Sequence, residues 1–209
     1  YQNARDLRYV QMCPWRCTGT YSGGRRRGAV EAGAGPASYA AAMELSEQTE
    51  YDATLAEVIA VETDWDEYLT RFAEGGDRDV ELIECRPDGD GFVIHNKRVV
   101  TVDLPGFARK ALKPANTVDH LVRIGPEVDG RREATYALDV LGAPVRTDGT
   151  IVFEEIEPGR TRHTVTCDVA VKVPLIGGKI ASWAKDDIVT QVRREFEYTR
   201  RRVAERRQG

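Results

Sequence analysis

Residues 165–207 constrain the fold most strongly, because there a strictly alternating strand runs into the longest amphipathic segment of the chain. Apolar and polar side chains alternate with the two-residue period of a strand that is buried on one face. Pro174 and the pair Gly177–Gly178 then end the strand and turn the chain toward a helix. The alternation predicts which side chains of the strand point inward: Val165, Cys167, Val169, Val171 and Val173.

The segment from Lys179 to Arg207 predicts a long helix with one buried face. At about 1.5 Å per residue this helix would span roughly 40 Å. A buried face of that length requires a broad apolar partner within the same domain. Its residues recur every three or four positions, as one side of a helix does: Ile176, Ile180, Trp183, Ala184, Ile188, Val192, Phe196, Thr199 and Val203.

The first 42 residues differ from the rest in charge and composition. They contain six Arg against two acidic residues, whereas the remainder contains 24 basic and 32 acidic residues. The segment is rich in Gly, Ala and Arg and has no apolar period, so it cannot bury enough surface to order itself. A secretory signal is disfavoured because Glu31, Pro36 and several glycines interrupt its apolar part. We expect residues 1–42 to be a disordered or non-native extension, Met43 to be the biological start, and residues 43–207 to form the domain.

The four cysteines predict neither a metal site nor a disulfide. Cys13 and Cys17 form one Cys-x-x-x-Cys pair without a second pair or a nearby His, so zinc binding is not expected. Cys85 and Cys167 fall within strand patterns, which favours buried thiols in a reducing, cytoplasmic compartment.

From Met43 onward the pattern predicts one strand, two short helices, six strands and the long helix. The second short helix begins at Asp64, and Glu67 lies three residues later, as in a capping box. Residues 104–116 interrupt the strands, and we expect a loop or a single helical turn over one end of the sheet. The expected strands are 44–51, 79–86, 91–103, 117–125, 133–141, 149–157 and 161–173, and the short helices are 54–61 and 64–76.

This order predicts an α+β fold. A single sheet is not stable with one bare apolar face, and bending it around the terminal helix buries both surfaces. We therefore expect a curved antiparallel sheet of about seven strands wrapped around the long C-terminal helix, with two short helices after the first strand. Such a sheet leaves space at its open side, where a pocket is expected.

Three segments resemble a bacterial family of unknown function within the START-like superfamily, which is also called SRPBCC or Bet v 1-like. They are MELSEQTEYDATLAEVIAV, LPGFARK and VAVKVPLIGGKIASWAKDDI. The element order is that of the helix-grip fold, which lipid-transfer domains, plant allergens and polyketide cyclases share. The resemblance covers residues 43 to about 205 and implies a START-like helix-grip domain with an apolar cavity. It brings no assigned catalytic residues.

Alternation along the strands and the helix face together predict the cavity lining. His120 shares parity with Val118 and Val122, and His163 shares parity with Val165, so both imidazoles are candidates to face inward. The alternative is that each histidine lies near a strand end and contacts water or a backbone carbonyl. The predicted lining is Phe92, Ile94, His120, Val122, Tyr136, Leu138, Phe153, Val165, Val169, Trp183, Ile188 and Val192.

The favoured function is a cytoplasmic carrier or sensor that binds a hydrophobic small molecule or lipid. The alternative is a cyclase-like or hydratase-like enzyme that uses His120, His163 or Tyr136 as general acid or base. A third is a filled core whose role is protein contact. The sequence has no nucleophile elbow, phosphate loop or His-Glu-x-x-His motif, so no cofactor or metal is expected.

Membrane insertion and nucleic-acid binding are both disfavoured. No apolar run of about 18 residues is present, as a membrane-spanning helix would require. Seven Arg from residue 193 onward stand against three Glu, and we interpret them as a solvated helix face rather than a surface for nucleic acid or anionic lipid. Ligand identity and oligomeric state are left open.

Overall fold

The computed structural model describes residues 41–110 and 112–208. The predictions for the extension up to residue 40, including those for Cys13 and Cys17, lie outside the described residues. The first strand begins at Ala41, two residues before Met43.

Seven strands form one antiparallel sheet in the order β1-β7-β6-β5-β4-β3-β2. The described elements are β1 (Ala41–Tyr51), α1 (Leu55–Glu62), α2 (Trp65–Gly75), β2 (Arg78–Asp88), β3 (Gly91–Thr101), η1 (Ala108–Lys110), β4 (Ala115–Val128), β5 (Arg131–Val140), β6 (Val145–Glu157), β7 (Arg160–Val171) and α3 (Gly177–Gln208).

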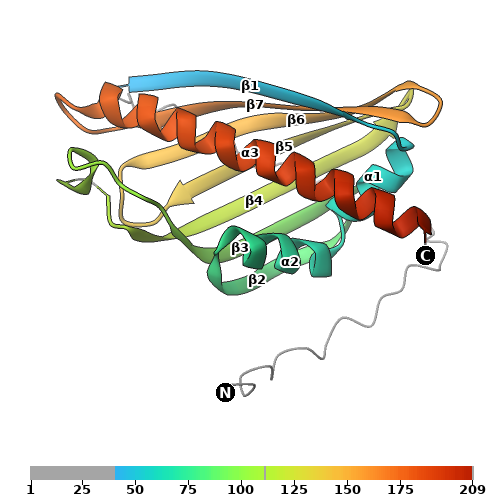
Figure 1. Ribbon diagram of the computed structural model, residues 1–209, viewed down its shortest axis with the longest axis horizontal. Helices are drawn as coiled ribbons and strands as arrows, with labels where there is room; N and C mark the ends of the chain where they lie inside the picture. Colours follow the sequence, from blue (N-terminus) through green and yellow to red (C-terminus); the bar gives the residue numbers. More distant parts are fainter. Residues whose placement is uncertain (1–40, 111, 209) are drawn as a thin grey trace, which may run out of the picture. The chain divides into compact units, whose positions relative to one another are not determined.

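Helix α3 lies along the inside of the curved sheet, as Figure 1 shows. It packs mainly against β1 and β7, at one side of the sheet, and against α1 near its C-terminal end. The predicted helix-grip architecture is therefore confirmed, including the two short helices after the first strand and the single turn η1 in the segment before β4.

Strand β7 confirms the predicted alternation. Val165, Cys167, Val169 and Val171 are buried against the helices, while Asp168 is exposed. His163 belongs to the same inward set and is also buried. Cys85 on β2 is only partly buried, in contrast to the buried thiol that the sequence predicted.

The capping box predicted for α2 is wrong. Asp64 does cap the helix, but its carboxylate accepts from the Asp66 N–H at 2.9 Å. Glu67 instead points toward α3, where it accepts hydrogen bonds from the Tyr198 hydroxyl at 2.6 Å and the Arg202 Nε at 2.7 Å. The chain forms a capping box at α1, where Thr54 and Glu57 satisfy each other's backbone N–H groups.

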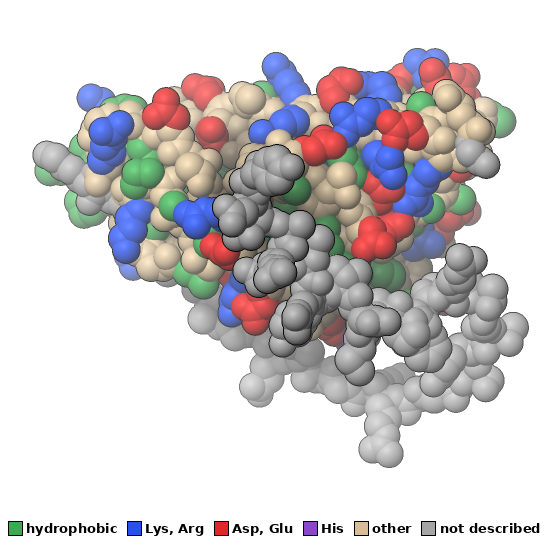
Figure 2. All heavy atoms as spheres, turned by 60° about the horizontal axis from the view of Figure 1, so that its bottom comes forward, with side chains coloured by type: hydrophobic (Ala, Val, Ile, Leu, Met, Phe, Trp, Pro, Cys, Tyr) green, Lys and Arg blue, Asp and Glu red, His purple; other side chains and the backbone are tan. Residues whose placement is uncertain are grey.

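Ion pairs hold the C-terminal half of α3 to the elements around it. Arg201 pairs with Glu74 at 2.8 Å, and Arg206 pairs with Asp64 at 2.5 Å. Figure 2 shows the resulting mixture of basic and acidic side chains at its right-hand end. The α3 arginines, which the sequence predicted to form a solvated face, are thus largely paired with acidic side chains of neighbouring elements.

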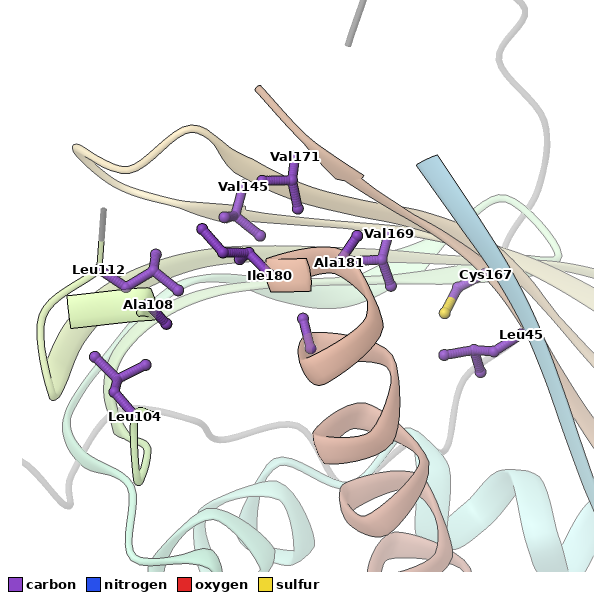
Figure 3. Packing of buried hydrophobic residues seen from close by; sticks show 11 residues of the cluster. Leu45, Leu104, Ala108, Leu112, Val145, Cys167, Val169, Val171, Ile180 and Ala181 are labelled. Atoms are coloured by element: carbon purple, nitrogen blue, oxygen red, sulfur yellow. The ribbon is translucent and has the colours of Figure 1, made fainter. Parts of the chain in front are cut away.

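Three apolar clusters fill parts of the space between the sheet and the helices. One lies under the first turns of α3, where Ile180 and Ala181 pack against Val169 and Val171 (Figure 3). A second joins α1, Phe153 and the end of α3. The third lies under α2. The region between these clusters holds the candidate site.

Candidate ligand cavity

A cavity of about 200 Å³ lies between the inner face of the sheet and helices α2 and α3. Strands β3 to β7 provide one wall, and α3 provides the opposite wall. The apolar lining consists of Tyr68, Phe72, Val100, Val102, Leu112, Val118, Val122, Tyr136, Leu138, Val140, Val145, Ile151, Val165, Trp183, Ala184, Ile188, Val192 and Phe196. The polar lining consists of Glu62, Arg71, Arg98, Asn116, His120, Thr147, His163, Asp187, Gln191 and Glu195.

Most of the predicted lining residues lie in this wall. The structure brings together His120, Val122, Tyr136, Leu138, Val165, Trp183, Ile188 and Val192. Alternation on the strands and the three-to-four spacing on α3 identified the faces that meet here.

Four predicted residues lie on the inner face but pack into the apolar clusters beside the cavity. Ile94 and Phe92 pack beneath α2. Phe153 packs beside α1, and Val169 packs beneath the start of α3. Inward parity places a side chain on the correct face, whereas the helix above it decides whether that side chain meets another side chain or open space.

His120 presents a fixed polar atom to the cavity. The Arg98 guanidinium donates to its Nδ1 at 3.3 Å, so Nδ1 is the acceptor and the proton of the neutral ring resides on Nε2. Burial lowers the pKa of His120 well below its usual value, and the positive charge of Arg98 lowers it further. The Nε2–H group has no hydrogen-bond partner among the described residues, so it is available to an acceptor on a ligand.

Arg98 is held in place from three sides. Its Nε donates to Asp77 at 2.7 Å, and its Nη1 also donates to the amide oxygen of Asn96 at 3.1 Å. The guanidinium lies over the Phe72 ring, 4.2 Å from the centroid. This arrangement fixes the His120 tautomer through a rigid neighbour.

A second polar group is built around Glu62 and Arg71, which pair at 3.1 Å. Thr199 donates to the second Glu62 oxygen at 2.7 Å. Burial alone raises the pKa of Glu62, but the Arg71 guanidinium and the Thr199 hydroxyl outweigh burial and lower it, so Glu62 is ionised. The Arg71 Nε is buried and has no hydrogen-bond partner among the described residues.

His163 lies beside this pair. The hydroxyl of Tyr51, whose pKa is raised by burial, lies 3.1 Å from His163 Nδ1. Burial lowers the pKa of His163 to about 4, so the ring is neutral, and its Nδ1 shares one hydrogen bond with the Tyr51 hydroxyl. Phe153 and Phe196 pack against the ring with centroids at 4.3 Å and 4.8 Å, and Nε2 has no partner among the described residues. Both imidazoles therefore have side-chain partners.

The third candidate, Tyr136, packs edge-on against His120 with ring centroids 6.3 Å apart. Burial raises the pKa of its hydroxyl, which also interacts with the Cys167 thiol. On the opposite wall, burial raises the pKa of Asp187, and Gln191 donates to its carboxylate at 2.6 Å. His120, His163 and Tyr136 share one cavity, but no hydrogen bond joins any two of these described side chains.

The charged part of the lining was not predicted from the sequence, although the sequence contains signals for it. Arg98 shares parity with Ile94 and Val100 on β3, so it interrupts an inward-facing series. Arg71 follows Tyr68 by three positions and therefore lies on the inner face of α2. Charged residues at such positions are informative, because an unpaired buried charge is costly.

Within the described residues, no group of His, Cys, Asp and Glu side chains is arranged to hold a metal ion. The same part of the chain contains no helix that is both long and apolar enough to cross a membrane.

The model of a family described as "Protein of unknown function (DUF2505)" matches residues 46–203. The chain belongs to the DUF2505 family. The uncharacterized protein Rv0481c of Mycobacterium tuberculosis is 29% identical over 138 residues, which cover 63% of this chain and 79% of that protein.

Solved structures share the fold of this DUF2505 protein at low sequence identity. The Zhui aromatase/cyclase from Streptomyces sp. R1128 superposes with a TM-score of 0.55 at 17% identity, covering 79% of this chain and 96% of the enzyme. The protein TTHA0849 from Thermus thermophilus gives a TM-score of 0.52 at 17% identity, covering 78% of this chain and 97% of that protein. These likenesses show a shared helix-grip fold and no more.

Proposed function

We propose that this DUF2505 protein is a carrier or sensor that binds a hydrophobic small molecule or lipid in the cavity between α3 and the sheet. The observation that supports it is an interior space of about 200 Å³ with a mostly apolar lining. Apolar side chains that line an empty space lack the van der Waals contacts of a packed core. A ligand that supplies these contacts is therefore favoured to bind.

The volume restricts the ligand. Drug-sized ligands occupy pockets of about 300–1,000 Å³, and this cavity is smaller. We therefore expect a compact ligand, such as a small ring system or a short acyl chain. Larger ligands would require α3 to move away from the sheet.

The polar lining adds a chemical requirement. The Nε2–H of His120 is a donor fixed by Arg98, and His120 lines the cavity together with apolar residues such as Val118 and Leu138. An oxygen acceptor on the ligand, such as a carbonyl or a hydroxyl, satisfies this donor without burying an unpaired charge. The proposed ligand is thus apolar with one oxygen acceptor.

The fluorescence of Trp183, which lines the cavity, provides the test. We expect 1-naphthol and 1-octanol to change this fluorescence saturably, and the change to disappear in Trp183→Phe. Ala184→Leu would fill the cavity and weaken binding at least about tenfold, because the added methylenes exclude the probe. Ala56→Leu makes the same change at an exposed site on α1 and is the matched control. Equal binding by the wild type, Ala184→Leu and Ala56→Leu would refute the proposal.

An enzyme is the second candidate, because two imidazoles and a phenol line the same cavity. The Zhui protein is an aromatase/cyclase, and a cyclase-like or hydratase-like reaction would use a neutral imidazole as general base. Turnover of a cyclisable ketone that is abolished in both His120→Gln and His163→Gln would favour the enzyme. Binding without turnover would favour the carrier or sensor.

We also propose a cytoplasmic location. The supporting observation is Cys167, whose buried thiol interacts with Tyr136 and forms no disulfide within the described residues. Mass analysis of the protein from its host after thiol labelling would test this location.

A further inference from the structure

Three connections meet at one end of the sheet: the loop between β3 and β4, the β5–β6 turn and the β7–α3 junction. Antiparallel pairing places them together, and the backbone N–H of Lys172 donates to the Pro144 carbonyl across the last two at 2.9 Å. We call this region the loop end; it comprises residues 102–110, 112–114, 141–144 and 172–179, at the left of Figure 1.

Each connection of the loop end exposes a large apolar side chain. Phe107 is 38% exposed, Leu141 is 46% exposed and Leu175 is fully exposed. Leu175 also has a φ of 67°, a left-handed conformation that Gly or Asn adopts at lower cost. A leucine that is both strained and fully in solvent gains nothing from the fold around it, which indicates a partner outside the chain.

Basic side chains surround these apolar residues. Arg109, Lys113, Lys172 and Lys179 are exposed, and the one described acidic side chain among them is Asp103. No ion pair in the described residues involves any of the four, although the α3 arginines are largely paired. Figure 2 shows hydrophobic and basic side chains next to each other at its left-hand end.

The opposite end of the sheet has the reverse character. Its three hairpin turns carry Asp88, Asp90, Asp129 and Glu157 against Arg131 and Arg160. The domain from Met43 onward is itself acidic, with 24 basic and 32 acidic residues. The unpaired positive charge of the loop end is therefore a local feature and not a consequence of composition.

We propose that the loop end docks onto the surface of an anionic phospholipid bilayer. Basic side chains are attracted to anionic headgroups, and Phe107, Leu141 and Leu175 would enter the interfacial layer between them. A second copy of the chain would bring like charges together, and nucleic acid offers no apolar layer for a leucine. Docking of this kind is peripheral and needs no membrane-spanning helix.

If the cavity binds a ligand, as proposed above, docking would bring it close to the bilayer. Val102, Leu112 and Val145 line the cavity and lie where the loop end joins β3, β4 and β6. A docked molecule would hold this end of the cavity next to the bilayer, from which an apolar ligand could be exchanged.

Co-sedimentation of the full chain with vesicles tests the docking directly and needs no cavity ligand. We expect binding to phosphatidylcholine vesicles that contain phosphatidylglycerol, little binding to phosphatidylcholine alone, and release by salt. Lys172→Gln with Lys179→Gln should weaken binding about 30-fold, from about 1 kcal/mol per basic residue. Leu175→Asn should weaken it about tenfold and leave the protein at least as stable, since Asn tolerates the backbone conformation.

The control variants carry the same kinds of substitution, apolar to Asn and basic to Gln, at sites outside the loop end. Val128→Asn removes a 61% exposed apolar side chain from the opposite end. Arg86→Gln with Arg123→Gln removes two exposed arginines from the sheet surface. Neither control should change vesicle binding.

The docking proposal would be overturned by a lack of binding to the anionic vesicles, by equal weakening in the controls, or by a mass that doubles with concentration and returns to the monomer in Leu175→Asn. Equal affinity for duplex DNA would also overturn it. Because the readout is vesicle binding, a failure here leaves the cavity proposal untouched, and a failure of the Trp183 assay leaves the docking proposal untouched.

Discussion

Neutralising Glu62 should strongly destabilise the protein, because the substitution removes the anion that forms an ion pair with the buried guanidinium of Arg71. The side chains of Arg71 and Glu62 are 10% and 7% exposed, and they lie 3.1 Å apart. Arg71 cannot relieve the loss by deprotonation, since the pKa of an arginine lies above 12. Breaking one side of such a pair costs about 3–5 kcal/mol. We expect Glu62→Gln to cost about 3 kcal/mol and to lower Tm by roughly 6–12 °C for a domain of this size.

A double-mutant cycle with urea unfolding separates the pair from the rest of the fold. Arg71→Met leaves Glu62 buried, and the double variant leaves no buried charge at the pair, so we expect a coupling energy of about 2 kcal/mol. The exposed pair of Arg201 and Glu74 is the matched control, and Glu74→Gln should cost no more than about 1 kcal/mol. Equal costs for Glu62→Gln and Glu74→Gln would contradict the expected extra cost of breaking the buried pair.

Two further predictions concern the imidazoles. The pKa of His163 is lowered to about 4 from an unfolded value near 6.5. The stability due to its neutral form is therefore fully present above pH 6.5 and is lost as the pH falls toward 4. This loss, about 3 kcal/mol, should be absent from the pH dependence of unfolding in His163→Phe. His120→Leu should weaken 1-naphthol binding about tenfold while His120→Gln, which retains a donor, weakens it less; equal losses in Trp183 titrations would contradict the donor role.

Strand and helix periodicity predicted the fold well because one face of each element is buried. The alternation along β7 and the repeating buried positions of α3 both follow from a single sheet closing on a single helix. The same periodicity placed His120, Tyr136 and Trp183 on the inner surface, where the structure has them.

Side-chain partners that lie far apart in the sequence could not be predicted in this way. Glu67 has the spacing of a capping residue, yet it meets Tyr198 and Arg202 more than 130 positions later. Arg98 contacts Asp77, which precedes β2, and His120 on β4, and neither contact follows from the position of Arg98 on β3. Local periodicity reports the face on which a residue lies, whereas tertiary packing decides what that residue contacts.

Native mass spectrometry of this DUF2505 protein, purified gently from its own host, shows whether the cavity carries a ligand. We expect a bound apolar molecule with an oxygen acceptor, present at up to one equivalent and absent from Ala184→Leu prepared in parallel. Wild-type protein that is free of such a molecule, and that also fails to bind 1-naphthol or 1-octanol, would contradict a ligand-binding role for the cavity.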